Sequence, residues 1–230
     1  KFDKFFSYSF SLDCVIFGYE KGMIHALLIK RAMKPFMGDW AIPGDLVYPD
    51  EDLSSAASRI LTELTKVEGV KLHQGQTFGK PDRHPQGRVI TNAYFALVRK
   101  DDVHAVADSW AEEVNWLPIR DIPQLAFDHN EIVIYAKERL KRRVKRRPVG
   151  FGLLPDAFTL GQLQNLYETA LGKTFDKRNF RKKLFKTTLL IDLDRKADGR
   201  APGQHKGSQL FSFNKEKYQK MKIQGYDFVF

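Results

Sequence analysis

A helical segment from about Asp52 to Lys66 carries charged residues whose spacing raises the question of metal chemistry. Glu63 lies four residues after Arg59, so the two share a helix face. Carboxylates hold Mg²⁺ or Mn²⁺ in phosphate-cleaving sites, where the ion neutralises phosphate charge and activates water. Ile60 and Leu64 are also one turn apart, and neither side chain binds a metal ion. Glu63 is therefore the one carboxylate between residues 59 and 64.

A second group of charged residues follows one face of a helix expected from Lys177 to Lys186. Phe180 and Leu184, four residues apart, have the spacing of core positions. The remaining face carries Lys177, Arg178, Arg181, Lys182, Lys183 and Lys186. Asp176 is suited to cap this helix, and an apolar helix from Leu160 to Leu171 precedes it. A helix, a short turn and a basic helix form the helix-turn-helix arrangement, whose second helix enters the major groove of DNA.

Residue type suggests separate roles on this basic face. Arginine fits guanine O6 and N7, and asparagine fits adenine N6 and N7, in bidentate pairs worth ~1–3 kcal/mol of discrimination. We therefore expect Arg178, Asn179 and Arg181 to read bases. The remaining cations, Lys177, Lys182, Lys183 and Lys186, are expected to contact phosphates.

Two strands expected after this helix, from Leu189 to Leu193 and from Leu210 to Phe213, enclose a glycine-rich hairpin. Such a hairpin beside a helix-turn-helix is a wing. Its cations Arg195, Lys196, Arg200 and Lys206 are expected to contact the DNA backbone or the minor groove.

The charge of the chain is concentrated in this C-terminal part. Residues 1–140 hold 17 Lys and Arg against 20 Asp and Glu, whereas residues 141–230 hold 21 against 8. The net charge of +10 therefore arises after residue 140, which predicts a polyanionic partner for that part only. A solvated basic surface is the alternative interpretation.

The composition bounds the class of protein. At 230 residues and 43% hydrophobic, the chain suffices for one large domain or two modest ones and is unlike a disordered protein. No stretch approaches the ~20 apolar residues of a membrane span, and no secretory signal is apparent, so we expect a cytoplasmic protein. Cys14, the only cysteine, lies in an apolar run and is expected to be a buried strand thiol.

The elements that position these residues differ between the two halves. The first half predicts strands at 12–19, 24–30, 70–78, 88–98 and 113–117 around the central helix. A helix from about 131 to 147 ends in a basic run before Pro148 and is expected to link two domains, residues 1–148 and 149–230.

The segment from Asp45 to Val67 resembles the signature of Nudix hydrolases, whose Arg-Glu-x-x-Glu-Glu helix holds metal against a diphosphate. The residues in register with that signature are Glu51, Arg59, Leu61, Glu63 and Val67. Asp45 and Lys66 stand where the signature has glycine, and Ile60 and Leu64 stand where it has metal-binding glutamates. The resemblance implies an α/β fold, a Nudix-like α/β/α sandwich, that lacks its metal site, so we expect no metal-dependent hydrolysis. A common amphipathic helix with an acidic start is the alternative interpretation.

The whole chain resembles the Nudix-related transcriptional regulators of bacteria, which join a Nudix-like effector domain to a winged helix-turn-helix. The stretches that carry this resemblance are 35–40, 125–129, 158–164 and 176–182. One branch of the family responds to ADP-ribose, and another, in gut Bacteroidetes, responds to L-arabinose. Residues 59–64 are most similar to the arabinose branch, although Asp45 and Lys66 depart from the family pattern.

The resemblance implies a homodimeric repressor that binds a pseudo-palindromic operator and needs no metal or cofactor. A pocket whose metal-binding stripe is apolar favours a small neutral polyol, such as L-arabinose, as the effector. The effector-binding candidates are Lys30, Arg31, Trp40, Glu63, Asp128 and His129. Several of them have structural roles as alternative interpretations: Trp40 in the core, Arg31 paired with Glu63, and Asp128 as a helix cap.

Three other functions remain open. The chain is alternatively a regulator that responds to ADP-ribose, or a DNA-binding protein whose Nudix-like part serves only in dimerisation. From a different class, it is a Nudix hydrolase of nucleoside diphosphate derivatives whose metal ligands come from Glu51, Glu63, Asp82, Glu112 or Glu113.

Overall fold

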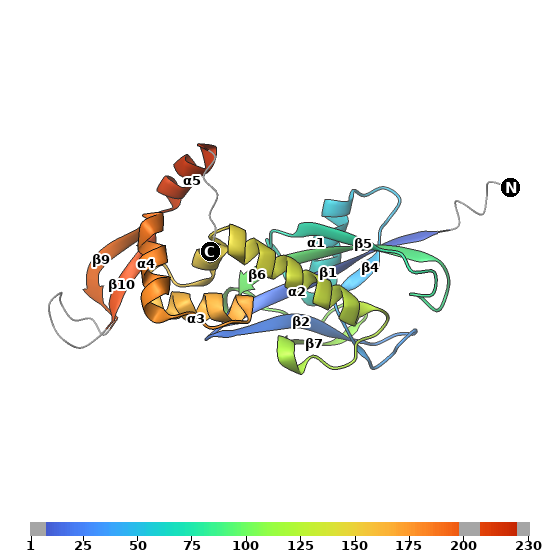
Figure 1. Cartoon of the computed structure of the whole chain (residues 1–230). Helices are drawn as coiled ribbons and strands as arrows, with labels where there is room; N and C mark the ends of the chain where they lie inside the picture. The colour runs from blue at the N-terminus through green and yellow to red at the C-terminus, as the bar shows by residue number, and fades with distance from the viewer. Residues whose placement is uncertain (1–7, 198–207, 225–230) are drawn as a thin grey trace. The chain divides into compact units, whose positions relative to one another are not determined.

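The computed structural model of the protein describes residues 8–197 and 208–224. Contacts between residues divide the described chain into two compact units. The first unit contains the residues up to 138 except 21–23, and the second contains residues 21–23 and those from 139 onward. Figure 1 labels the α-helices and most of the strands of both units.

The first unit is built on a seven-stranded mixed sheet. Its five-strand path runs β3 (Trp40–Ala41), β2 (Met23–Arg31), β1 (Ser9–Glu20), β6 (Val89–Arg99) and β5 (His73–Phe78). The short β4 (Gly44–Leu46) pairs with β1, and β7 (Ala111–Pro118) pairs with β2, both antiparallel. β1 and β6 are parallel along their whole length, with Asp13 opposite Ala93. The five strands expected from the sequence are all present, with ends shifted by up to three residues.

One face of the sheet is covered by α1 (Leu53–Thr65). Alternate residues of β1, namely Leu12, Cys14 and Ile16, share a core with the buried face of this helix, including Ile60 and Leu64. The helix begins where Asp52 accepts hydrogen bonds from the backbone N–H groups of residues 54 and 55. It ends at residue 66, which has a φ of 57°.

The opposite face of β1 presents Asp13 toward the beginning of α2 (His129–Arg146). Within the first unit, Tyr135 of α2 contacts β5 through an edge-to-face ring pair with Phe78, whose centroids lie 5.7 Å apart. Helix, sheet and helix thus form the α/β/α sandwich expected from the sequence. Because α2 runs past residue 138, it belongs to both units.

The second unit is a helix pair with a small sheet. α3 (Leu160–Leu171) begins with a capping box between Thr159 and Gln162 and ends at Gly172, whose φ is 66°. α4 (Lys177–Thr187) follows, and Phe180 and Leu184 bury its apolar side. β10 (Gln209–Phe213) lies between β9 (Leu190–Lys196) and β8 (Phe158–Thr159) in a three-stranded sheet. The helix-turn-helix and the wing strands were expected.

Several short or polar elements were not expected from the sequence. They are β8, the helix α5 (Lys215–Ile223), and the 3-10 helices at Lys100–Asp102, Ile119–Asp121 and Val149–Leu153. Among the residues that the structure describes, no helix is both long and apolar enough to cross a membrane.

Candidate functional site

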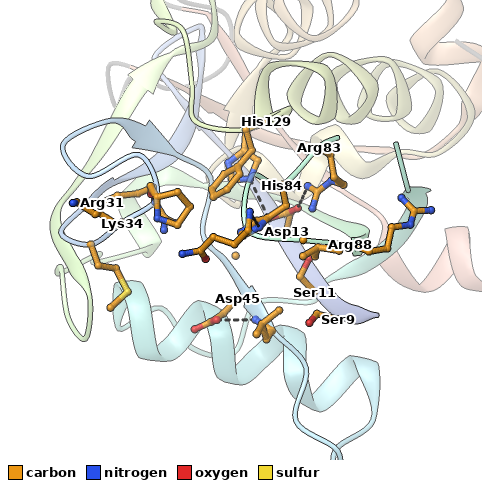
Figure 2. A pocket seen from close by; sticks show the side chains of 18 of the residues that line it. Ser9, Ser11, Asp13, Arg31, Lys34, Asp45, Arg83, His84, Arg88 and His129 are labelled. Atoms are coloured by element: carbon orange, nitrogen blue, oxygen red, sulfur yellow. Dashed lines mark hydrogen bonds and ion pairs between the residues drawn. The ribbon is translucent and has the colours of Figure 1, made fainter. Parts of the chain in front are cut away.

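A cavity of about 450 Å³ opens in the first unit, beside β1 and the start of α2 (Figure 2). Its walls come from segments far apart in the sequence, namely β1, the loop after β2, β4, the loop before β6 and the residues around 110 and 127–129. The charged side chains of the wall are Asp13, Arg31, Lys34, Asp45, Arg83 and Arg88. Four cations against two carboxylates make the wall electropositive.

Arg83 is held in this wall by two buried carboxylates. Its Nε and Nη2 atoms donate to the two oxygens of Asp128, at 3.0 and 2.7 Å, and Nη2 lies 3.2 Å from Asp13 Oδ2. The side chains of Arg83, Asp13 and Asp128 are only 3%, 6% and 9% exposed. A bidentate arginine–carboxylate pair in such surroundings fixes the orientation of the guanidinium plane.

His129 completes this network from the first residue of α2. Its Nδ1 accepts a hydrogen bond from the backbone N–H of Ile42 at 3.2 Å, which places the ring proton on Nε2. Nε2 lies 3.3 Å from Asp13 Oδ1 (Figure 2). Burial alone raises the pKa of Asp13, but the interactions with His129 and Arg83 outweigh it and hold that pKa below its usual range. Asp13 is therefore ionised at neutral pH.

Aromatic rings position a second arginine of the wall. The Arg31 guanidinium lies 4.7 Å from the centre of the Trp110 ring and 5.0 Å from that of Phe127. Its Nε donates to the carbonyl of Pro35 at 2.8 Å. Phe127 also stacks on His84, and its backbone has a φ of 54°, an unfavourable value for a residue with a Cβ atom. Two aromatic rings and a hydrogen bond thus hold Arg31 in the wall of the cavity.

The remaining groups of the wall leave positive charge facing the cavity. Burial lowers the pKa of Arg31, and Asp45 and Asp13 oppose that shift. Asp45 accepts a hydrogen bond from Trp110 Nε1 at 3.1 Å. Arg88 donates to the carbonyl of Gly79 at 2.6 Å. Since Arg83 is neutralised by its own carboxylates, the wall offers Arg31, Lys34 and Arg88 to an anionic ligand.

The charged residues of α1 lie outside the cavity and bind one another. Arg59 donates to both oxygens of Glu51, at 2.5 and 2.9 Å, and to Glu63 at 2.9 Å. Ile60 and Leu64 are 0% and 1% exposed and belong to the core. Among the residues that the structure describes, no three His, Cys, Asp or Glu side chains gather as a metal site.

The six effector candidates are divided by the structure. Arg31 and His129 line the cavity, and Asp128 holds Arg83 from behind the wall. The carboxylate of Asp128 binds Arg83, and its carbonyl accepts from the first-turn N–H groups of residues 131 and 132, so the side chain is an ion-pair partner and not the helix cap. The three others, Lys30, Trp40 and Glu63, do not line the cavity, and Glu63 pairs with Arg59 and not with Arg31.

Sequence reasoning missed most of the cavity wall. Asp13 and Arg83 are 70 residues apart, and neither belongs to a local pattern. One signal was available, because Asp13 is a charged residue inside the apolar run of β1. A charge buried in a strand requires a partner, and that requirement points to a distant cation.

The basic helix of the second unit has a different character. On α4, Phe180 and Leu184 are 2% and 0% exposed, whereas Lys177, Arg178, Asn179, Arg181, Lys182, Lys183 and Lys186 are all exposed. Of the expected wing cations, Arg195 is exposed and Lys196 is half-buried. Arg200 and Lys206 lie outside the described residues.

Both halves match known protein families. Residues 9–136 match the NUDIX domain, and residues 150–213 match the NrtR DNA-binding winged helix domain. The chain is 31% identical over 225 residues, 96% of its length and 84% of the relative's, to the ADPR responsive transcriptional repressor NtrR of Acinetobacter baylyi.

Solved structures of one relative agree with this match. NrtR of Shewanella oneidensis in complex with a 27mer DNA is 30% identical, with a TM-score of 0.73 over 95% of this chain and 97% of that one. The NUDIX domain of the same protein in complex with ADP ribose is 32% identical, with a TM-score of 0.54 over 57% of this chain and 87% of that one. The chain therefore belongs to the NrtR-type family of regulators, in which a Nudix domain precedes a DNA-binding winged helix domain.

Proposed function

We propose that the protein is a transcriptional repressor that binds DNA through α4 and the wing and responds to ADP-ribose bound in the cavity of its Nudix domain. The electropositive wall of the cavity carries the effector proposal. ADP-ribose has a diphosphate, and Arg31, Lys34 and Arg88 offer it positive charge in a volume typical of small-molecule sites. The relatives named above, one ADPR responsive and one crystallised with ADP ribose, support the same choice.

The cavity gives less support to a neutral sugar. L-arabinose was expected because Ile60 and Leu64 would give the pocket an apolar wall, but both residues lie on the buried face of α1 and belong to the core. Within our proposal, the arabinose branch of the family is therefore the weaker assignment, and L-arabinose serves as the comparison ligand in the experiment below.

The proposed DNA surface is the exposed face of α4. Arg178, Asn179 and Arg181 read base edges, and Lys177, Lys182, Lys183 and Lys186 contact phosphates. Arg195 and Lys196, together with Arg200 and Lys206, contact the backbone or the minor groove from the wing. We further propose a homodimer on a pseudo-palindromic operator, with domains at 1–148 and 149–230; light scattering of the chain and of its DNA complex tests the stoichiometry.

We also propose that the Nudix domain does not hydrolyse its ligand. Glu51 and Glu63, the carboxylates that remain in register with the signature, both bind Arg59, and positions 60 and 64 supply no metal ligand. This donor set does not fit a divalent metal ion. Cleavage of the ADP-ribose diphosphate in the presence of Mg²⁺ or Mn²⁺, if Glu63→Gln abolished it, would overturn this part of the proposal.

Calorimetry with the full chain tests the effector. We expect ADP-ribose to bind and L-arabinose to give no heat, and Arg31→Ala to weaken ADP-ribose binding at least tenfold, because it removes a guanidinium from the cavity wall. Arg120→Ala is the matched control, since Arg120 is exposed and does not line the cavity. Tighter binding of L-arabinose than of ADP-ribose would reverse the assignment.

A further inference from the structure

The network around Arg83 joins the cavity to the helix that enters the second unit. Arg83 itself lines the cavity, as do its partner Asp13 and the adjacent His129. Asp128 and His129 lie at the first turn of α2, which continues to residue 146. The part of α2 up to residue 138 belongs to the first unit and the remainder to the second.

The contacts at this turn tie its backbone to the cavity wall. The carbonyl of Asp128 accepts hydrogen bonds from the N–H groups of Glu131 and Ile132, at 2.9 and 3.3 Å, and these bonds form the first turn of the helix. The carboxylate of the same residue accepts two hydrogen bonds from Arg83. The Nδ1 atom of His129 accepts a hydrogen bond from the backbone N–H of Ile42. The position of the first turn of α2 therefore depends on the same buried charges that face the cavity.

An anionic ligand that reaches Arg83 from the cavity disturbs this arrangement. Arg83 is neutralised by two carboxylates that are nearly inaccessible to solvent, so a phosphate placed near its guanidinium competes with Asp13 and Asp128 for the same donors. A guanidinium that turns toward the ligand loosens its hold on Asp128. Because α2 is a continuous helix from residue 129 to residue 146, its hydrogen-bonded backbone connects this first turn to residues of the second unit.

We propose that the buried cluster of Asp13, Arg83, Asp128 and His129 is the coupling element through which occupation of the cavity changes DNA binding. Asp128 acts as a positioning residue in this cluster: it holds Arg83 toward the helix in the empty state. The inference rests on the proposed function, because it concerns how the same cavity regulates the same DNA surface. It adds the path of coupling, and that path is testable apart from the identity of the ligand.

The chain offers a matched control for this cluster. Lys80 and Glu131 join the same loop to the same turn of α2 through an ion pair of 2.7 Å, but both side chains are more than half exposed and neither lines the cavity. Asp128→Asn weakens the buried link, and Glu131→Gln weakens the exposed one. If coupling requires only that the loop and helix be tied together, the two variants behave alike; if it requires the buried charges, only Asp128→Asn changes.

The experiment measures DNA affinity with and without saturating ADP-ribose, on a duplex selected from a random pool by the wild-type chain. The ratio of the two dissociation constants is the coupling factor. We expect Glu131→Gln to keep the wild-type factor and Asp128→Asn to reduce it at least fivefold, with saturation verified separately by calorimetry. Arg83→Lys, which keeps the buried positive charge but not the bidentate geometry, gives the same test in a variant whose buried charge is the same as in the wild type. A wild-type factor in both Asp128→Asn and Arg83→Lys overturns the inference.

The ligand-free measurements separate this inference from the proposed function. If ADP-ribose leaves wild-type DNA binding unchanged, the proposed effector is wrong. The affinities without ligand then decide the coupling: a shift of at least threefold in Asp128→Asn, beside less than twofold in Glu131→Gln, supports the cluster as the coupling element. Equal affinities of both variants and the wild type overturn it.

Discussion

Arginine and lysine side chains serve opposite purposes in the two units of this protein. In the Nudix domain, Arg83 is 3% exposed, and its Nε and Nη2 atoms donate to the carboxylates of Asp128 and Asp13. On α4, the cations Arg178, Arg181 and Lys182 are exposed and face solvent. A buried ion pair fixes the geometry of its side chains, and removal of one partner strongly destabilises the fold. Exposed cations instead favour the binding of a polyanion, with an affinity that depends on salt. The first arrangement suits a sensor and the second suits a DNA surface.

The largest expected effect follows from removing the buried cation. Arg83→Met leaves Asp13 and Asp128, whose side chains are only 6% and 9% exposed, without their arginine partner. We expect a loss of ~3–5 kcal/mol in the free energy of unfolding. Urea denaturation followed by fluorescence measures it, and a loss below 1 kcal/mol means that the carboxylates find solvent or other partners.

A pH titration of stability examines the same network without removing it. The folded state holds the pKa of Asp13 below its usual range, so its ionised form stabilises the fold above the unfolded pKa of ~3.9, and that stability is lost as the pH falls through the lower folded pKa. The gap in unfolding free energy between the wild type and Asp13→Asn is therefore constant near neutrality and shrinks below about pH 4. A gap that instead grows as the pH falls contradicts the direction of the shift.

Base recognition by α4 is expected to have a smaller effect, confined to sequence preference. Arg178→Ala or Arg181→Ala removes a bidentate partner for guanine, at ~1–3 kcal/mol for the matched base pair. Gel shifts with the selected operator and with single-base variants measure this preference. A uniform loss across all duplexes identifies the altered residue as a phosphate contact.

Lys182→Ala is expected to change affinity for all duplexes alike. Affinity falls as salt rises, and loss of one phosphate contact makes the negative slope of log affinity against log salt shallower by about one unit. Titrations at several salt concentrations provide the slope, and Lys80→Ala in the Nudix domain is the control with an unaltered slope. An unchanged slope in Lys182→Ala removes that residue from the DNA surface.

The smallest expected effect is on the stability of exposed pairs. Lys80→Ala breaks an ion pair whose partners are more than half exposed, so we expect a change in unfolding free energy far smaller than that of Arg83→Met. Comparison with Arg83→Met in the same urea series shows whether burial sets the difference. Similar losses in both variants contradict the contrast between matched buried charge and exposed charge.

The two regions also differ in how far the sequence predicted them. α4 is local, so the spacing of Phe180 and Leu184 and the cap at Asp176 were enough to predict the helix and its basic face. The cavity is assembled from segments joined by strand pairing and helix packing, and nothing in the neighbourhood of Arg83 indicates its partners. β8 was missed because two residues carry no period, although its pairing with β10 places it in the sheet.

If the cavity and the proposed DNA surface are energetically linked, each ligand changes the affinity of the other by the same factor, and this reciprocity provides the most direct test. ADP-ribose affinity is measured by calorimetry for the free chain and for the chain saturated with its selected operator. We predict two different affinities, whose ratio equals the factor by which saturating ADP-ribose changes operator affinity. Equal ADP-ribose affinities in the presence and absence of DNA would contradict the account.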